Sequence, residues 1–111
     1  MKTSEINFKV TLDDNNLPED IVWEATDKPD DIDHTKTIAI AVWDEVQKNT
    51  LFLNIWTKEM PVTEMKKFYI DSIGAMSQYL LTATGDEVMA NELKETATRL
   101  EKMLIDELNK Q

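Results

Sequence analysis

The fold of this chain is decided by residues 35–57, which read TKTIAIAVWDEVQKNTLFLNIWT. Side chains alternate in character on both sides of a polar centre, which is the pattern of two strands joined by a hairpin connection. One strand is expected over residues 35–43 and the next over 50–57, with the polar segment 44–49 between them. The pattern therefore predicts an antiparallel strand pair in the middle of the chain.

The two faces of this strand pair differ in character. One face is aliphatic and is expected to point to the core, with Ile38, Ile40, Val42, Leu51, Leu53 and Ile55. Because successive side chains of a strand point in opposite directions, a second set shares the other face: Ala39, Ala41, Trp43, Phe52 and Trp56. If the helices cover one face of the sheet, this aromatic face stays open and needs an explanation.

Two further strands come earlier in the chain. Residues 5–12 alternate between apolar and polar, and residues 20–26 hold Ile21, Val22 and Trp23. Between them the turn formers of residues 13–16 predict a tight connection. Short connections favour neighbouring antiparallel strands, so we expect all four strands to form one meander.

The period of the apolar pattern changes after residue 57. Apolar residues recur every three or four positions over residues 62–83 and again over 87–109, which predicts two helices. Gly85 is expected to end the first helix, and Asp86 to cap the second. The expected fold is α+β, a four-stranded antiparallel sheet followed by two C-terminal helices, in a single domain over residues 1–111.

Composition excludes several classes of function. The 111 residues carry 22 acids and 12 bases, for a net charge of −10, which disfavours binding to nucleic acid or to anionic lipid. There is no cysteine, so disulfides, thiolate zinc sites and thiol catalysis are excluded. The start of the chain lacks the apolar stretch of a signal peptide, and the longest apolar run has six residues, so we expect a cytoplasmic protein without a membrane span.

No group of residues indicates catalysis, a cofactor or a metal. The single histidine, His34, lies beside Asp30, Asp31 and Asp33, which is the chemistry of a metal site, but we interpret the cluster as a solvated acidic loop. Residues 13–33 carry nine acids and one base, and form either a solvated rim or a docking surface for a basic partner. We therefore expect a protein that is not an enzyme.

Several stretches together resemble the gliding-motility protein GldC family of the Bacteroidetes. They are WEATDKP at 23–29, WD at 43–44 with QKNTL at 47–51, WTKEMPV at 56–62, FYID at 68–71 and ATGD at 83–86. The resemblance implies a small cytoplasmic protein that supports surface gliding and, by association, the secretion machinery linked to it. The family supplies no catalytic motif to carry over. A weaker similarity, of fold only, is to the SecB-type export chaperones, which form oligomers and hold unfolded clients.

Three hypotheses follow for the function. The first is a non-enzymatic accessory of gliding that binds a protein partner, and the second is a SecB-like holdase that binds unfolded clients on the aromatic face. The third is an enzyme or metal protein that uses Asp30, Asp33 and His34. The aromatic face itself has three candidate covers: the rest of the monomer, another subunit of a homo-oligomer, or a partner or client protein.

Overall fold

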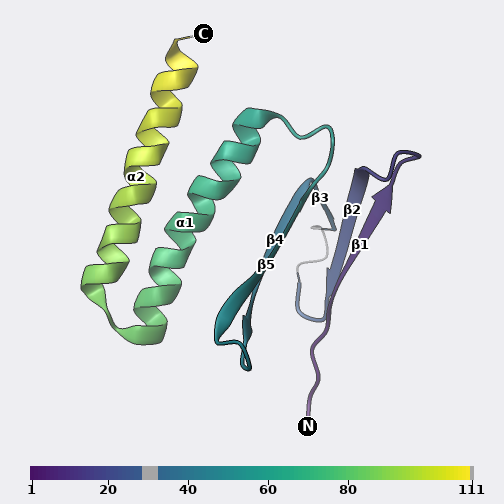
Figure 1. Cartoon of the computed structure of the whole chain (residues 1–111), viewed down its shortest axis with the longest axis horizontal. Helices are drawn as coiled ribbons and strands as arrows, with labels where there is room; N and C mark the ends of the chain where they lie inside the picture. The colour runs from purple at the N-terminus through teal and green to yellow at the C-terminus, as the bar shows by residue number, and fades with distance from the viewer. Residues whose placement is uncertain (29–32, 111) are drawn as a thin grey trace. The chain divides into compact units, whose positions relative to one another are not determined.

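The computed structural model describes residues 1–28 and 33–110 and places five strands before two helices in them (Figure 1). The elements are β1 (Ile6–Leu12), β2 (Pro18–Ala25), β3 (His34–Thr35), β4 (Thr37–Asp44), β5 (Asn49–Trp56), α1 (Val62–Thr84) and α2 (Glu87–Asn109). The α+β class with two C-terminal helices is thus confirmed. The chain forms two compact units, Met1–Met60 and Pro61–Gln111, which are described one at a time.

The prediction of one four-stranded meander is wrong. The strands of the first unit form a three-stranded antiparallel sheet, β1-β2-β3, and a separate two-stranded antiparallel sheet, β4-β5. The expected third strand, 35–43, is divided at Lys36, so that β3 pairs with β2 while β4 pairs with β5.

The register of β2 explains this division. Ile21 lies opposite Thr35, and continuing that register would set Ala39 opposite Leu17. Leu17 belongs to the turn that leads from β1 to β2, which is closed by a 2.9 Å hydrogen bond from the Asp13 N–H to the Leu17 carbonyl. β2 also begins with Pro18, which has no N–H to donate to a neighbouring strand. β4 therefore runs past the end of β2 and finds no partner there.

The core of the first unit is small. Among the described residues of this unit, two large side chains are buried. Ile21 is fully buried, and Ile38 is 8% exposed. Phe8 stacks on Trp23 with 6.2 Å between ring centroids, and the Lys28 ammonium lies 5.8 Å from the centre of the Trp23 ring. Few side chains thus hold the three-stranded sheet together.

Asp13 organises the turn between β1 and β2. Its Oδ1 accepts hydrogen bonds from the N–H groups of Asn15 at 2.8 Å and Leu17 at 3.0 Å, while its Oδ2 accepts one from Lys58 Nζ at 2.8 Å. Asn16 takes the left-handed conformation that closes the turn, with φ of 63°. The turn that the acidic and amide residues predicted is confirmed, and the Lys58 contact ties it to the segment after β5.

Stability should depend on the ionisation of Asp13. The hydrogen bond from Lys58, followed by those from the Leu17 and Asn15 N–H groups, lowers the pKa of Asp13 from 3.8 to about 2. Because the folded pKa is below the unfolded one, the stabilisation is complete above pH 3.8 and is lost as the pH falls through about 2. Denaturant unfolding of the wild type and of Asp13→Asn should therefore give free energies that converge over this interval. A difference in unfolding free energy between the two proteins that stays constant as the pH falls would show that the ionisation of Asp13 does not stabilise the fold.

The second unit is a hairpin of two antiparallel helices, side by side in Figure 1. Gly85 ends α1 with φ of 72°, and its N–H donates to the Leu81 carbonyl at 2.8 Å. The Asp86 side chain accepts a 2.9 Å hydrogen bond from the Met89 N–H at the start of α2. Both the expected helix stop and the expected cap are confirmed.

Small residues bring the two helices together. Ser77 and Ala90 are buried, and the Ser77 hydroxyl donates a 2.8 Å hydrogen bond to the Ala90 carbonyl. Gly74 lies opposite Ala97, where a Cβ on the glycine would be 3.9 Å from the Ala97 Cβ. Because these side chains are short, the backbones can approach closely over this part of the hairpin.

Ala90→Leu should destabilise the helical hairpin by about 1–3 kcal/mol, because the larger side chain has no space against α1. The matched control is Gly74→Ala, which meets Ala97 at ordinary contact distance and removes a flexible residue from a helix. The control should raise stability by about 0.5–1 kcal/mol. Thermal unfolding followed by helical circular dichroism measures both changes. Equal midpoints for Ala90→Leu and the wild type would show that the contact is loose.

Candidate functional site

The aromatic face of the β4-β5 hairpin is the first candidate site. In the register of this pair, Ala41 lies opposite Phe52, Trp43 opposite Thr50, and Trp56 opposite Thr37. Because residues directly opposite each other point to the same side, the structure brings all five predicted residues together on one face: Ala39, Ala41, Trp43, Phe52 and Trp56. Thr37, Thr50 and Asn54 share that face and add polar groups to it.

The large side chains of this face are open to water. Trp43 and Phe52 are each 58% exposed, and Trp56 is 46% exposed. Since a buried aromatic ring removes roughly 150–250 Å² from water, each of these leaves about 100 Å² exposed. The three rings together leave a few hundred Å² of apolar surface on this face, which is comparable to the largest patch on a typical monomer, and such patches are often functional.

The opposite face of the hairpin is buried only at one end. Ile38 is buried and Ile55 is half-buried, as expected for a core face. The prediction that the whole face belongs to the core is wrong at the hairpin tip, where Val42, Leu51 and Leu53 are 53%, 57% and 52% exposed. The reason is the division of the sheet, because the tip extends beyond the strands that could cover it.

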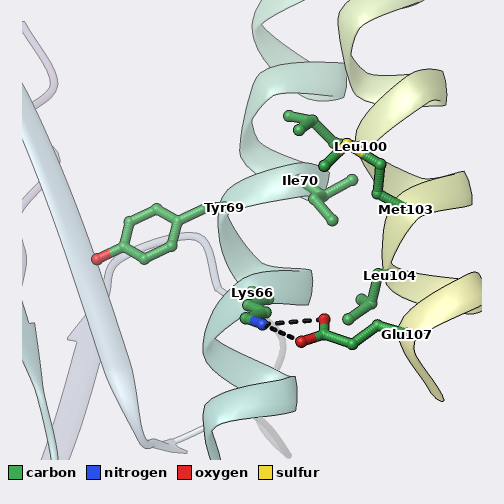
Figure 2. Close-up of a pocket in the computed structure, with 7 residues that line it drawn as sticks. All are labelled: Lys66, Tyr69, Ile70, Leu100, Met103, Leu104 and Glu107. Carbon is green, nitrogen blue, oxygen red and sulfur yellow. Dashed lines mark hydrogen bonds and ion pairs between the residues drawn. The ribbon is translucent and has the colours of Figure 1, made fainter. Parts of the chain in front are cut away.

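A second candidate site, which the sequence did not predict, is an apolar groove between α1 and α2 (Figure 2). It has a volume of about 520 Å³ and is lined by Lys66, Tyr69, Ile70, Leu100, Met103, Leu104 and Glu107. Figure 2 shows Ile70 and Leu104 between the helices, whereas Tyr69 points away from α2. Lys66 Nζ closes one end of the groove with contacts of 2.7 and 2.9 Å to the Glu107 carboxylate.

The groove results from the unequal size of the side chains along the helical hairpin. The helices touch through small residues at Gly74 and Ser77, whereas larger residues at Ile70 and Leu100 line the groove. The signal for it was therefore present in the order of small and large residues. It could not be used without knowing which turns of the two helices meet.

The histidine cluster does not form a metal site in the part that the structure describes. His34 is 64% exposed, with its Nδ1 3.2 Å from Asp20 Oδ1 and its Nε2 4.0 Å from Asp33 Oδ1. Asp30 and Asp31 lie outside the described residues. Over residues 1–28 and 33–110, no three histidine or acidic side chains come close enough together to hold a metal ion. What is described is an exposed contact between His34 of β3 and Asp20 of β2.

Neither α1 nor α2 combines the length and the apolar character needed to cross a bilayer, and the described residues contain no other such helix.

Comparison with known proteins identifies one family. A family model described as gliding motility-associated protein GldC-like matches residues 18–106. No curated protein and no solved structure matches the chain. The matched region contains the aromatic face and the groove residues from Lys66 to Leu104, while Glu107 at one end of the groove lies just beyond it.

Proposed function

The chain belongs to the GldC-like family of gliding motility-associated proteins, and on this premise we propose that it is an accessory protein that supports gliding by binding another protein. This is the family that the sequence motifs indicated. The proposed partner is a component of the gliding machinery or of the secretion machinery linked to it. The proposed place of action is the cytoplasm, where the acidic chain would meet the partner without binding nucleic acid.

The aromatic face of the hairpin carries the proposal. Trp43 and Phe52 are more than half exposed, and the residues of β4 and β5 that share their face are uncharged. Burial of about 100 Å² of each ring contributes on the order of 2.5 kcal/mol per ring. Exposed tryptophans of this kind are the residues that dominate the affinity of protein interfaces. Two aromatic anchors, Trp43 and Phe52, with polar neighbours can hold a partner specifically.

The pKa shifts of Asp13, Lys58 and Lys67 are of the kind that surface ion pairs produce. Hydrogen bonds lower the pKa of Asp13 and raise those of Lys58 and Lys67. All three shifts favour the charged form of the group, whereas acid-base catalysts need pKa values moved toward neutrality. The shifts belong to ion pairs that stabilise turns and a helix surface. We propose a non-enzymatic role without cofactor or metal because no group of residues in the sequence indicates catalysis, cofactor binding or metal binding.

The acidic stretch 13–33 offers a different docking mode, because it could attract a basic partner. Salt concentration separates the two modes. Attraction between charged surfaces weakens as salt screens it, whereas burial of aromatic rings does not. We propose the aromatic face as the docking site and the acidic stretch as a solvated rim.

The experiment is affinity capture from cells that glide, with the full chain as bait, at low and at high salt. The expected result is recovery of a component of the gliding or secretion machinery that persists at high salt. Recovery of no such component, in cells where the tagged chain restores gliding to a deletion strain, would refute the proposal. Recovery that disappears at high salt would move the docking site to the acidic stretch.

A holdase that binds unfolded clients is the second candidate, since the hairpin tip exposes apolar residues on both faces. The similarity with SecB-type chaperones is one of fold only, and no solved structure matches the chain to support it. A holdase would suppress aggregation of an unfolded protein in proportion to its concentration, and Phe52→Asp or Trp56→Asp would remove this effect. Unchanged aggregation in the presence of the wild type excludes this candidate.

A further inference from the structure

We propose that a second copy of this chain pairs with the outer edge of β5, antiparallel and with Leu53 on the two-fold axis. The β5 edge and its side chains on both faces carry this inference, which goes beyond the proposed function. It concerns the edge of the strand rather than the aromatic face, so the two proposals can fail independently.

From Asn49 to Trp56 one edge of β5 pairs with no strand in the described part of the chain, because the sheet contains β4 and β5 alone. Just after β5, the Lys58 N–H donates a 3.0 Å hydrogen bond to the carbonyl of Pro18, the first residue of β2. The Thr57 N–H donates a 2.7 Å hydrogen bond to the Lys36 carbonyl, which fixes the alternation along the β4-β5 ladder. In an antiparallel pair every second residue turns its N–H and C=O toward the partner strand. Leu53 therefore turns its backbone groups to β4, and Thr50, Phe52 and Trp56 turn theirs to the open edge.

This edge lacks the features that prevent strands from pairing with other chains. β5 reads NTLFLNIW, with no charge, no proline and no glycine, and its register with β4 is unbroken over eight residues. β1, one of the two edge strands of the other sheet, carries Lys9 and an irregularity between Thr11 and Leu12. Charges and bulges are the common protection of edge strands, so β1 is protected and β5 is not.

The side chains of β5 are complementary to those of an identical strand. With Leu53 on the axis, Leu53 meets Leu53 of the second copy and Leu51 meets Ile55 of the second copy. On the other face, Thr50 meets Trp56 of the second copy. Within β5 no charged residue meets a like charge in this arrangement, and the two aromatic faces become one surface; just outside the strands, the same register sets Lys58 opposite Lys48 of the second copy. Such a self-complementary contact is what a two-fold symmetric dimer requires.

The charge of the chain favours a second copy at this edge rather than elsewhere. Two copies with a net charge of −10 each repel one another wherever acidic surfaces meet, and β5 is free of charge over its whole length. Pairing of one edge buries less than the roughly 800 Å² per partner of a standard interface. We therefore expect a dissociation constant on the order of micromolar. Because salt screens the repulsion, added salt should strengthen the dimer.

Sedimentation of the full chain over a range of concentrations tests the dimer. The expected mass rises from 12.8 kDa to twice that value, and higher salt moves the transition to lower concentration. A constant mass of 12.8 kDa up to the highest soluble concentration overturns the proposal. So does a mass that grows beyond the dimer without limit, because a closed two-fold contact stops at two copies.

Engineered cysteines test the register, since the chain has none of its own. In Leu53→Cys the two sulfurs meet across the axis at a residue pair with about 4.5 Å between Cα atoms, which suits a disulfide. The matched control Leu51→Cys has nearly the same exposure, but its two copies lie about 14 Å apart along the strands. Mild oxidation should cross-link Leu53→Cys by itself. It should not cross-link Leu51→Cys by itself, but it should cross-link a mixture of Leu51→Cys and Ile55→Cys. Equal rates of cross-linking for Leu51→Cys and Leu53→Cys would show that Leu53 does not lie on the two-fold axis.

Opposite charges at the axis give an independent test. Leu53→Lys and Leu53→Glu should each be monomeric, because like charges face each other across the axis, and a mixture of the two should form a heterodimer. Tryptophan fluorescence checks that each variant is folded, since Leu53 is half exposed and tolerates a polar side chain. A folded Leu53→Lys with the wild-type mass at every concentration overturns the proposal. Partner capture by the same variant tests the proposed function separately.

Discussion

Replacing Trp43 and Phe52 together by serine should abolish capture of the protein partner while the chain stays folded. Truncation of a central aromatic residue in an interface costs about 2 kcal/mol or more, which is roughly a 30-fold loss of affinity for each residue. Both rings are 58% exposed, so the fold loses only part of their contacts. Affinity capture at equal bait concentration measures the loss, and tryptophan fluorescence of Trp23 and Trp56 reports the fold.

The hairpin supplies a matched control for this double variant. Val42 and Leu51 lie opposite each other on the other face of the same two strands and are 53% and 57% exposed. Val42→Ser combined with Leu51→Ser should weaken the strand pair to a similar extent and leave capture intact. If both double variants lose the partner equally, hairpin stability and not the aromatic face is what binding requires. Full capture by the Trp43 and Phe52 variant would exclude the face as the docking site.

Ile21→Ala should lower the free energy of unfolding by about 3 kcal/mol, within the range of roughly 2–5 kcal/mol for such truncations in a core. Ile21 is fully buried at the centre of β2, where it lies opposite Val10 on one side and Thr35 on the other. Small domains have about 5–15 kcal/mol of stability in total, so this single change removes a large share of it.

Denaturant unfolding followed by tryptophan fluorescence measures this loss, because all three tryptophans lie in residues 1–60. The control is Val46→Ala in the hairpin turn, where the side chain is 86% exposed and the change should stay within about 0.5 kcal/mol. A shift for Ile21→Ala no larger than that of the control would show that the buried cluster around Ile21 does not hold the sheet together.

The candidate site was predictable because strand faces depend on local geometry alone. The period of two places Ala39, Ala41 and Trp43 on one side of β4, wherever the strand lies in the fold. The hairpin connection then fixes which residues of β5 join them, such as Phe52. The exposure of the hairpin tip and the groove at Ile70 could not be predicted in the same way, because each depends on elements distant in the sequence.

Features that arise between near neighbours in the chain follow from the amino-acid sequence without any tertiary contact. These are the strand faces, the turn at Asp13, the helix stop at Gly85 and the cap at Asp86, each of which depends on backbone conformation or hydrogen bonds within a few residues. The tertiary structure alone decided that the strands form two sheets, because the partner of β4 depends on where β2 ends in space. It also decided where the helices separate, since this depends on which side chains of α1 and α2 meet.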